Sequence, residues 1–290
     1  MVRAVAVVLL AGCGHVDFAP LATGDGGGDG GTAACTTFGA WSTPQALTDL
    51  DTIDNDWEPE LSADGQWLVF SSDRAGGGQH LYLAQRTGPT AFGAPTEIAA
   101  LTSATQEVGP AWDGASANLY FVRTTTTNPI LLASAFSNGS FAAPVQVASL
   151  ASDSVVAPSI SEDNLEMAFS TSSTASSELD DITRASPSDP WPTAETVLEP
   201  PATGWPSISA DRLTMYYESD SGSNDEIYVM TRPAIGQPFG APTPFELDDT
   251  TVDEGDPFIS HDGLTYLFAS ARAGSLGASD LWMSTRSCLD

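Results

Sequence analysis

The sequence predicts an all-β protein, specifically a five-bladed β-propeller of four-stranded antiparallel blades. Three observations lead to this fold class. A motif recurs five times at intervals of about fifty residues, apolar residues alternate at period two within each copy, and a segment near the N-terminus matches the one strand missing from the last copy. No stretch shows helical periodicity.

Five prolines align the repeats, and successive prolines are separated by 51, 48, 48 and 51 residues. These prolines are Pro59, Pro110, Pro158, Pro206 and Pro257. An aromatic residue stands eleven positions after each: Phe70, Phe121, Phe169, Tyr217 and Phe268. The repeats begin near residues 54, 105, 153, 201 and 252. Because this register holds in all five copies, the repeats are predicted to share one structure.

Each repeat carries the signals for four strands. A short strand at the proline is followed by a turn such as Asp64-Gly65, which tolerates positive φ, and then by a strand with alternating apolar residues. A third apolar segment follows, as at 81–84, and a fourth begins with an aromatic residue and a proline, as at Phe92 and Pro95. Four short strands per repeat are typical of a propeller blade.

The fifth repeat ends after its third strand, and we expect its fourth strand to come from the N-terminal side. Trp41-Ser-Thr-Pro44 matches the fourth-strand pattern and precedes the first complete repeat. A strand there closes the ring and removes exposed sheet edges. Cys35 and Cys288 flank this closure, so we predict a disulfide between them in an oxidising compartment, with two free thiols as the alternative.

The N-terminus predicts export and attachment to a membrane. Residues 1–12 read as a signal peptide, and Leu10-Ala11-Gly12-Cys13 resembles the lipobox of bacterial lipoproteins, which implies lipidation of Cys13. An ordinary secretory signal is the alternative. Residues 13–34 form a Gly/Asp-rich tether, and residues 35–290 form the propeller. Because Gly14 follows the cysteine where an Asp would signal inner-membrane retention, we expect a lipid-anchored protein of the bacterial outer membrane.

The charge balance limits the partners. The formal net charge is -29, from 38 acidic residues against nine arginines and no lysine. Such a surface repels phosphate backbones and anionic headgroups, so nucleic acid is excluded as a partner and contact with the membrane is expected only through the lipid anchor. The same charge opposes self-association, and we expect a monomer.

The first repeat resembles a known repeat family. Pro59-x-Leu61-Ser62-x-Asp64-Gly65, with Leu68-x-Phe70 and Asp73-Arg74 after it, is similar to the WD40-like β-propeller repeat of TolB-type proteins. The resemblance covers about residues 38–290, although Ala115 replaces the turn Asp in the second copy. It implies a periplasmic or surface propeller that binds partners through its ends or channel and performs no chemistry. TolB itself has six blades and a separate N-terminal domain, and this sequence predicts neither.

Acidic loops provide the candidate site. In a propeller, the loops that enter each first strand and the loops between the second and third strands share one face, and acidic residues of the first and fifth copies crowd these loops. The predicted binding-face residues are Asp54, Asp56, Glu58, Asp73, Arg74, Asp220, Asp253, Glu254, Asp256 and Arg272. Within this set, the residues expected to bind Ca²⁺, if the rim takes an ion, are Asp54, Asp56, Asp253 and Asp256.

The sequence favours a binding or scaffolding protein for a protein or envelope partner, with no catalytic residues and no cofactor. It contains no G-x-S-x-G elbow and no P-loop, and its three histidines are scattered. Two alternatives stay open. Five-bladed propellers also include glycoside hydrolases, which need paired carboxylates, and the acidic rim fits a Ca²⁺-dependent carbohydrate-binding module.

Overall fold

The structure is a computed structural model of the chain, and it describes residues 35–290 with internal gaps. The gaps are residues 126–127, 151–153, 173–176, 194–195, 199–202 and 220–223, and the side chains of residues 172, 177 and 203 are also not described. The predicted signal peptide and tether, including Cys13, therefore lie outside the described residues, as does Asp220.

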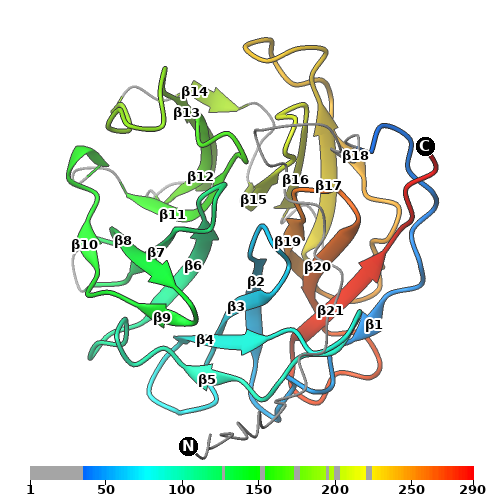
Figure 1. Ribbon diagram of the computed structural model, residues 1–290. Helices are drawn as coiled ribbons and strands as arrows, with labels where there is room; N and C mark the ends of the chain where they lie inside the picture. Colours follow the sequence, from blue (N-terminus) through cyan, green and yellow to red (C-terminus); the bar gives the residue numbers. More distant parts are fainter. Residues whose placement is uncertain are drawn as a thin grey trace, which may run out of the picture. The chain divides into compact units, whose positions relative to one another are not determined.

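Five antiparallel sheets surround a common centre and form a five-bladed β-propeller, which confirms the predicted fold class (Figure 1). The strands of each blade are given from the centre outwards. Blade 1 consists of β2 (Asp56–Leu61), β3 (Trp67–Ser72), β4 (His80–Gln85) and β5 (Thr96–Glu97), and blade 2 of β6 (Glu107–Trp112), β7 (Asn118–Arg123), β8 (Ile130–Ser137) and β10 (Val145–Gln146), with β9 (Ser140–Phe141) beside β8.

Blade 3 consists of β11 (Val155–Ile160), β12 (Glu166–Ser172), β13 (Ser177–Thr183) and β14 (Thr196–Leu198), and blade 4 of β15 (Thr203–Ile208), β16 (Thr214–Ser219), β17 (Glu226–Thr231) and β18 (Thr243–Pro244). Blade 5 consists of β19 (Glu254–Ile259), β20 (Thr265–Ser270), β21 (Asp280–Thr285) and β1 (Gln45–Ala46).

The innermost strands β2, β6, β11, β15 and β19 form the wall of the channel, and each contacts the next around the ring. A single 3-10 turn (Ala148–Leu150) is the helical element of the described chain. No helix among the described residues is long and apolar enough to cross a membrane.

The turns between the first two strands of blades 1, 3 and 5 follow the sequence prediction, whereas blades 2 and 4 place Ser116 and Arg212 at the positive-φ position. Gly65, Asn164 and Gly263 have φ values of 66°, 61° and 69°, in the left-handed region that glycine and asparagine tolerate best. The preceding Asp caps the turn, since the Asp64 carboxylate accepts a hydrogen bond from the Ser62 hydroxyl at 2.6 Å.

Apolar side chains pack between neighbouring blades. The aromatic residues that recur eleven positions after the repeat prolines are all 1% exposed or less. One cluster joins Leu61 and Phe70 of blade 1 with Phe258 and Leu281 of blade 5. Since burying each such side chain contributes about 1.5–3 kcal/mol, these contacts hold the blades together around the ring.

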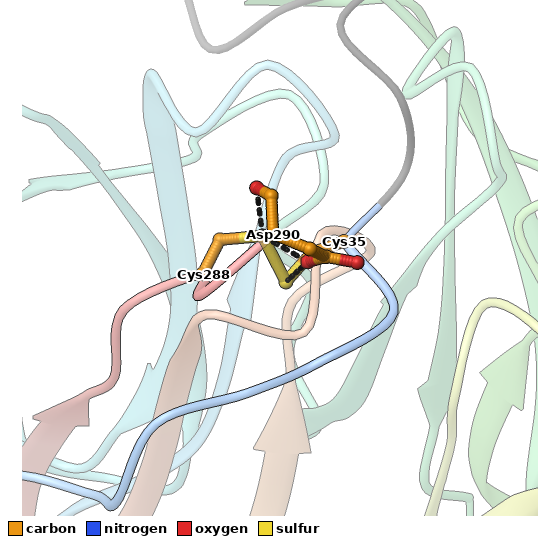
Figure 2. Close-up of side chains that lie close together, drawn as sticks. All are labelled: Cys35, Cys288 and Asp290. Carbon is orange, nitrogen blue, oxygen red and sulfur yellow. Dashed lines mark hydrogen bonds between the residues drawn. A yellow bond between two sulfur atoms is a disulfide. The ribbon is translucent and has the colours of Figure 1, made fainter.

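The ring closes as the sequence predicts. Strand β1 pairs antiparallel with β21, and Gln45 lies opposite Met283. A disulfide joins Cys35 to Cys288, with their Cα atoms 5.7 Å apart (Figure 2). Beside it, the Asp290 carboxylate accepts the backbone N–H groups of Thr36 and Thr37 at 3.1 and 3.2 Å. The two ends of the propeller are therefore tied together covalently and by hydrogen bonds.

Candidate functional site

The channel is narrowed by one residue from each blade, the residue before the repeat proline. The register of every innermost strand shifts at this point. The five residues have positive φ: Glu58 54°, Gly109 57°, Ala157 45°, Trp205 50° and Asp256 53°. Left-handed backbone costs about 1–3 kcal/mol for residues other than glycine, so the backbone is strained at the four of these positions that are not glycine.

Glu58 cross-links three blades inside this channel. Its carboxylate accepts hydrogen bonds from the Ser71 hydroxyl at 2.7 Å, the Gly109 N–H at 2.7 Å and the Trp205 Nε1–H at 3.1 Å. Burial raises the pKa of Glu58 although these donors favour the charged form. The side chain thereby joins blades 1, 2 and 4 at the centre of the ring.

Two further carboxylates lie next to Glu58. Burial, followed by repulsion from Glu218 and Glu58 and a smaller effect of Asp225, raises the pKa of Asp256 well above its ordinary value. Burial likewise raises the pKa of Glu60. The channel therefore holds acidic groups that favour the protonated form.

Little open space remains in the channel. The cavity lined by these residues and the repeat prolines measures about 20 Å³. A water molecule needs roughly 10–15 Å³ by this measure, so the cavity accommodates about one water and no sugar ring.

The predicted binding face does bring the two sets of loops together, but its arginines are engaged in ion pairs. Arg74 binds Asp56 at 2.5 Å and donates to the Leu50 carbonyl at 2.9 Å. Arg272 pairs in the same way with Glu254 and with the Leu247 carbonyl. Each arginine thus fastens the loop that enters its blade to the start of the innermost strand.

The same arrangement recurs in blade 2. Arg123 binds Glu107 at 2.8 Å and donates to the Leu101 carbonyl at 2.6 Å. This third copy indicates that the pairs at Arg74 and Arg272 maintain the architecture of the face.

Of the other predicted residues on this face, Asp253 is exposed, and Asp54 and Asp73 are half-buried. Asp73 accepts the Asn55 N–H at 2.8 Å. Glu58 and Asp256 lie in the channel. The structure therefore separates the predicted set into buried ion pairs, channel residues and a small group that solvent reaches.

The carboxylates that gather most closely differ from the predicted Ca²⁺ ligands. Asp56 lies with Asp51 and Asp280, and one carboxylate oxygen of each is within 4.8 Å of the others. Asp54, Asp253 and Asp256 do not belong to this group. Asp280 opens the third strand of the fifth repeat, and only the closure of the ring brings it beside the first repeat.

Sequence reasoning missed Trp205 and Glu218. Trp205 stands at the position of Glu58 in the fourth repeat, directly before its proline, and this alignment was the available signal. Glu218 lies in β16, and one of its oxygens is 3.3 Å from the Asp256 N–H. No pattern in the sequence distinguishes Glu218 from other strand residues.

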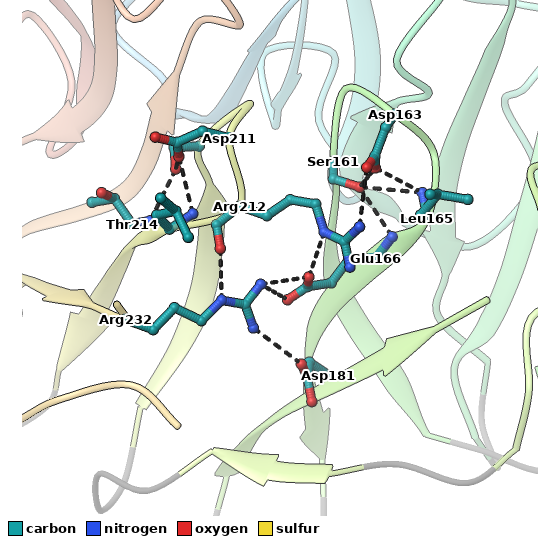
Figure 3. A network of polar contacts seen from close by, with 11 residues as sticks. Ser161, Asp163, Leu165, Glu166, Asp181, Asp211, Arg212, Thr214 and Arg232 are labelled. Carbon is teal, nitrogen blue, oxygen red and sulfur yellow. Dashed lines mark hydrogen bonds and ion pairs between the residues drawn. The ribbon is translucent and has the colours of Figure 1, made fainter. Parts of the chain in front are cut away.

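A second buried network lies between blades 3 and 4 (Figure 3). Glu166, which is fully buried, accepts a hydrogen bond from Arg212 Nε at 2.7 Å and two from Arg232 Nη2 at 2.6 and 2.9 Å. Arg212 also binds Asp163 at 3.0 Å. Burial, followed by repulsion from Glu166, raises the pKa of Asp181 to about 6.

The fold is similar to solved propellers of two functional kinds. TolB from Acinetobacter baumannii is 18% identical, with a TM-score of 0.50 over 74% of this chain and 49% of that chain. This chain therefore spans about half the length of that TolB. The catalytic domain of a GH62 α-L-arabinofuranosidase from Coprinopsis cinerea is 11% identical, with a TM-score of 0.56 over 85% of this chain and 96% of that chain.

An endo-arabinase from Bacteroides thetaiotaomicron is likewise 11% identical, with a TM-score of 0.55 over 84% of this chain and 97% of that chain. No protein-family model matches the sequence, and no curated protein matches it. At these identities the likeness establishes the propeller fold alone, and the neighbours are divided between enzymes and TolB.

Proposed function

We propose that this protein is a non-catalytic binding or scaffolding propeller of the bacterial cell envelope, held at the outer membrane by a lipid on Cys13. The observation that carries the proposal is the filled channel. Glu58 uses its carboxylate to bind three blades, and the remaining cavity of about 20 Å³ is far too small for a substrate.

The glycoside hydrolases among the structural neighbours suggest a second candidate function, hydrolysis of an arabinofuranoside. Such enzymes place two carboxylates on either side of a bound sugar. The raised pKa of Asp256 suits a general acid. Against this candidate, Glu58 is occupied by hydrogen bonds and no sugar ring fits in the channel cavity, so we favour binding without chemistry.

Binding is then expected at the face that carries the acidic loops. Asp253 is exposed there, and Asp54, Asp73 and Asp249 are partly accessible. Together with the net charge of -29, these groups favour a protein or envelope component that presents basic groups.

An affinity capture from envelope extracts tests this proposal. The full-length protein is compared with the double variant Asp73→Lys, Asp253→Lys and with the control Glu162→Lys, which changes an exposed acid in a hairpin turn of blade 3. We expect a partner that the wild type and the control retain and that the double variant loses. Equal capture by all three proteins would contradict binding through this face.

A hydrolysis assay tests the alternative. Aryl arabinofuranosides and arabinan are incubated with the wild type, Glu58→Gln and Asp256→Asn, and we expect no turnover by any of them. Turnover by the wild type that either substitution abolishes would contradict a non-catalytic propeller.

A further inference from the structure

Three aspartates from the first and last blades meet where the ring closes. Asp51 lies in the loop between β1 and β2, Asp56 opens β2, and Asp280 opens β21. One carboxylate oxygen of each lies within 4.8 Å of the other two. Residues more than two hundred positions apart in sequence thus form one carboxylate cluster, which we call the closure cluster.

The closure cluster contains buried oxygens with no hydrogen-bond partner. Asp56 and Asp280 are both 0% exposed. Among the described residues, four of its buried oxygens have no partner: both of Asp51, Oδ2 of Asp56 and Oδ1 of Asp280. An unsatisfied buried carboxylate oxygen is strongly unfavourable, because burial removes the water that would otherwise solvate it.

The arginine beside the closure cluster does not neutralise the charge of its three carboxylates. Arg74 binds Oδ1 of Asp56 at 2.5 Å, and one guanidinium faces three carboxylates. Burial, followed by repulsion from Asp280 and Asp56, raises the pKa of Asp51 to about 7. The arrangement therefore carries excess negative charge when all three groups are ionised.

Backbone hydrogen bonds fix Asp280 and the loops beside the cluster. The Leu276 and Gly277 N–H groups donate to Oδ2 of Asp280, the second at 2.9 Å. Asn55 Oδ1 accepts the Ala278 and Ser279 N–H groups at 3.0 and 3.1 Å and thereby fastens the β20–β21 loop to the start of blade 1. The hydrogen bonds that fix the β1–β2 loop and the β20–β21 loop here do not use the four unpartnered oxygens.

We propose that the closure cluster binds a Ca²⁺ ion through Asp51, Asp56 and Asp280. Ca²⁺ binds oxygens at 2.3–2.6 Å, so oxygens on opposite sides of the ion lie up to about 5 Å apart, and the three carboxylate oxygens, all within 4.8 Å of one another, are close enough to share one ion. Mg²⁺ usually keeps several waters and is bound through one or two carboxylates, so a buried cluster of three carboxylates suits it less well. The four unpartnered oxygens supply part of the coordination, and water completes it.

The ion would have a defined structural effect. It joins the first residue of β21 to the entrance of blade 1, whereas the Cys35–Cys288 disulfide fastens the segment that follows the same strand. The site also fixes two loops of the proposed binding face. This inference goes beyond the proposed function and does not depend on the identity of the partner.

Calorimetric titration at pH 8 tests the site. Chelator-treated full-length protein is titrated with Ca²⁺ and, separately, with Mg²⁺. We expect one Ca²⁺ site with a dissociation constant between about 1 μM and 1 mM, and weaker binding of Mg²⁺. Asp51→Asn should weaken Ca²⁺ binding at least tenfold, whereas Asp54→Asn, a carboxylate on the same loop outside the cluster, should leave it unchanged.

Thermal unfolding of the same proteins provides a second readout. In chelator, Asp51→Asn should unfold at a higher temperature than the wild type because it removes repulsion; in Ca²⁺ it should unfold at a lower one. The absence of saturable Ca²⁺ binding by the wild type, unchanged binding by Asp51→Asn, or stronger binding of Mg²⁺ than of Ca²⁺ would overturn the proposal.

Discussion

Two junctions of the ring bury carboxylates, and they neutralise them differently. Between blades 3 and 4, Glu166 is bonded by two arginines through both of its oxygens. Between blades 5 and 1, the closure cluster has three carboxylates beside one arginine and keeps four buried oxygens without a partner. We call these regions the 3/4 junction and the 5/1 junction.

The comparison shows that the buried carboxylates of the two junctions differ in how far arginines of the chain neutralise them. At the 3/4 junction two arginines of the chain itself bind the buried carboxylate of Glu166, so this charge is paired without a ligand. The 5/1 junction has one arginine beside three carboxylates, and it is also the place where the chain has to close upon itself. A disulfide already stabilises this junction, and a bound cation would neutralise its carboxylates.

The largest effect is expected from removing the anion of the 3/4 junction. Glu166→Ala leaves two buried guanidinium groups without their partner and should lower the free energy of unfolding by about 3–5 kcal/mol in denaturant titrations. The exposed neighbour Glu162→Ala should change it by less than about 0.5 kcal/mol. A loss below about 1 kcal/mol for Glu166→Ala would show that the network does not stabilise this junction.

Opening the disulfide tests the covalent part of the 5/1 junction. The double variant Cys35→Ser, Cys288→Ser should lose about 2–5 kcal/mol of unfolding free energy, since the bond closes a loop with a sequence separation of 253 residues. Reduction of the wild type should produce the same loss. If the denaturation midpoint stays unchanged in both cases, the disulfide is not what holds the ring closed.

A smaller effect is expected in the channel, where Asp256 is buried beside other carboxylates. Because the pKa of Asp256 is raised in the folded protein, its contribution to stability is present in acid and is lost as pH rises through the folded value. Unfolding free energies between pH 5 and pH 8 should therefore fall less steeply for Asp256→Asn than for the wild type. At pH 8 the variant should be more stable than the wild type.

The exposed Asp253→Asn serves as the control for this pH series and should follow the wild-type curve. Identical slopes for the wild type and Asp256→Asn would contradict the raised pKa.

The fold followed from the sequence because its determinants repeat. Pro59 and its four equivalents set the register, the Asp-Gly and Asp-Asn turns set the hairpins, and Trp41-Ser-Thr-Pro44 identified the closing strand. Five copies of a weak local signal reinforce one another, and closure then placed Cys35 beside Cys288.

The site was less accessible to sequence reasoning because its contacts depend on loop conformations and on side chains that reach from one blade to another. The sequence indicated that Asp56 and Arg74 lie on one face, but not that they pair with each other and are removed from the surface. Asp51 and Asp280 join Asp56 through loop conformations that no repeat specifies. Trp205 and Glu58 meet only because the channel is narrow enough for a side chain to cross it.

A crystal structure of the protein grown with Ca²⁺ tests the central claim most directly. Anomalous difference density should show a Ca²⁺ ion at the 5/1 junction with oxygens of Asp51, Asp56 and Asp280 at 2.3–2.6 Å, and no ion at the 3/4 junction. Well-ordered carboxylates with only water between them, at saturating Ca²⁺, would contradict the claim.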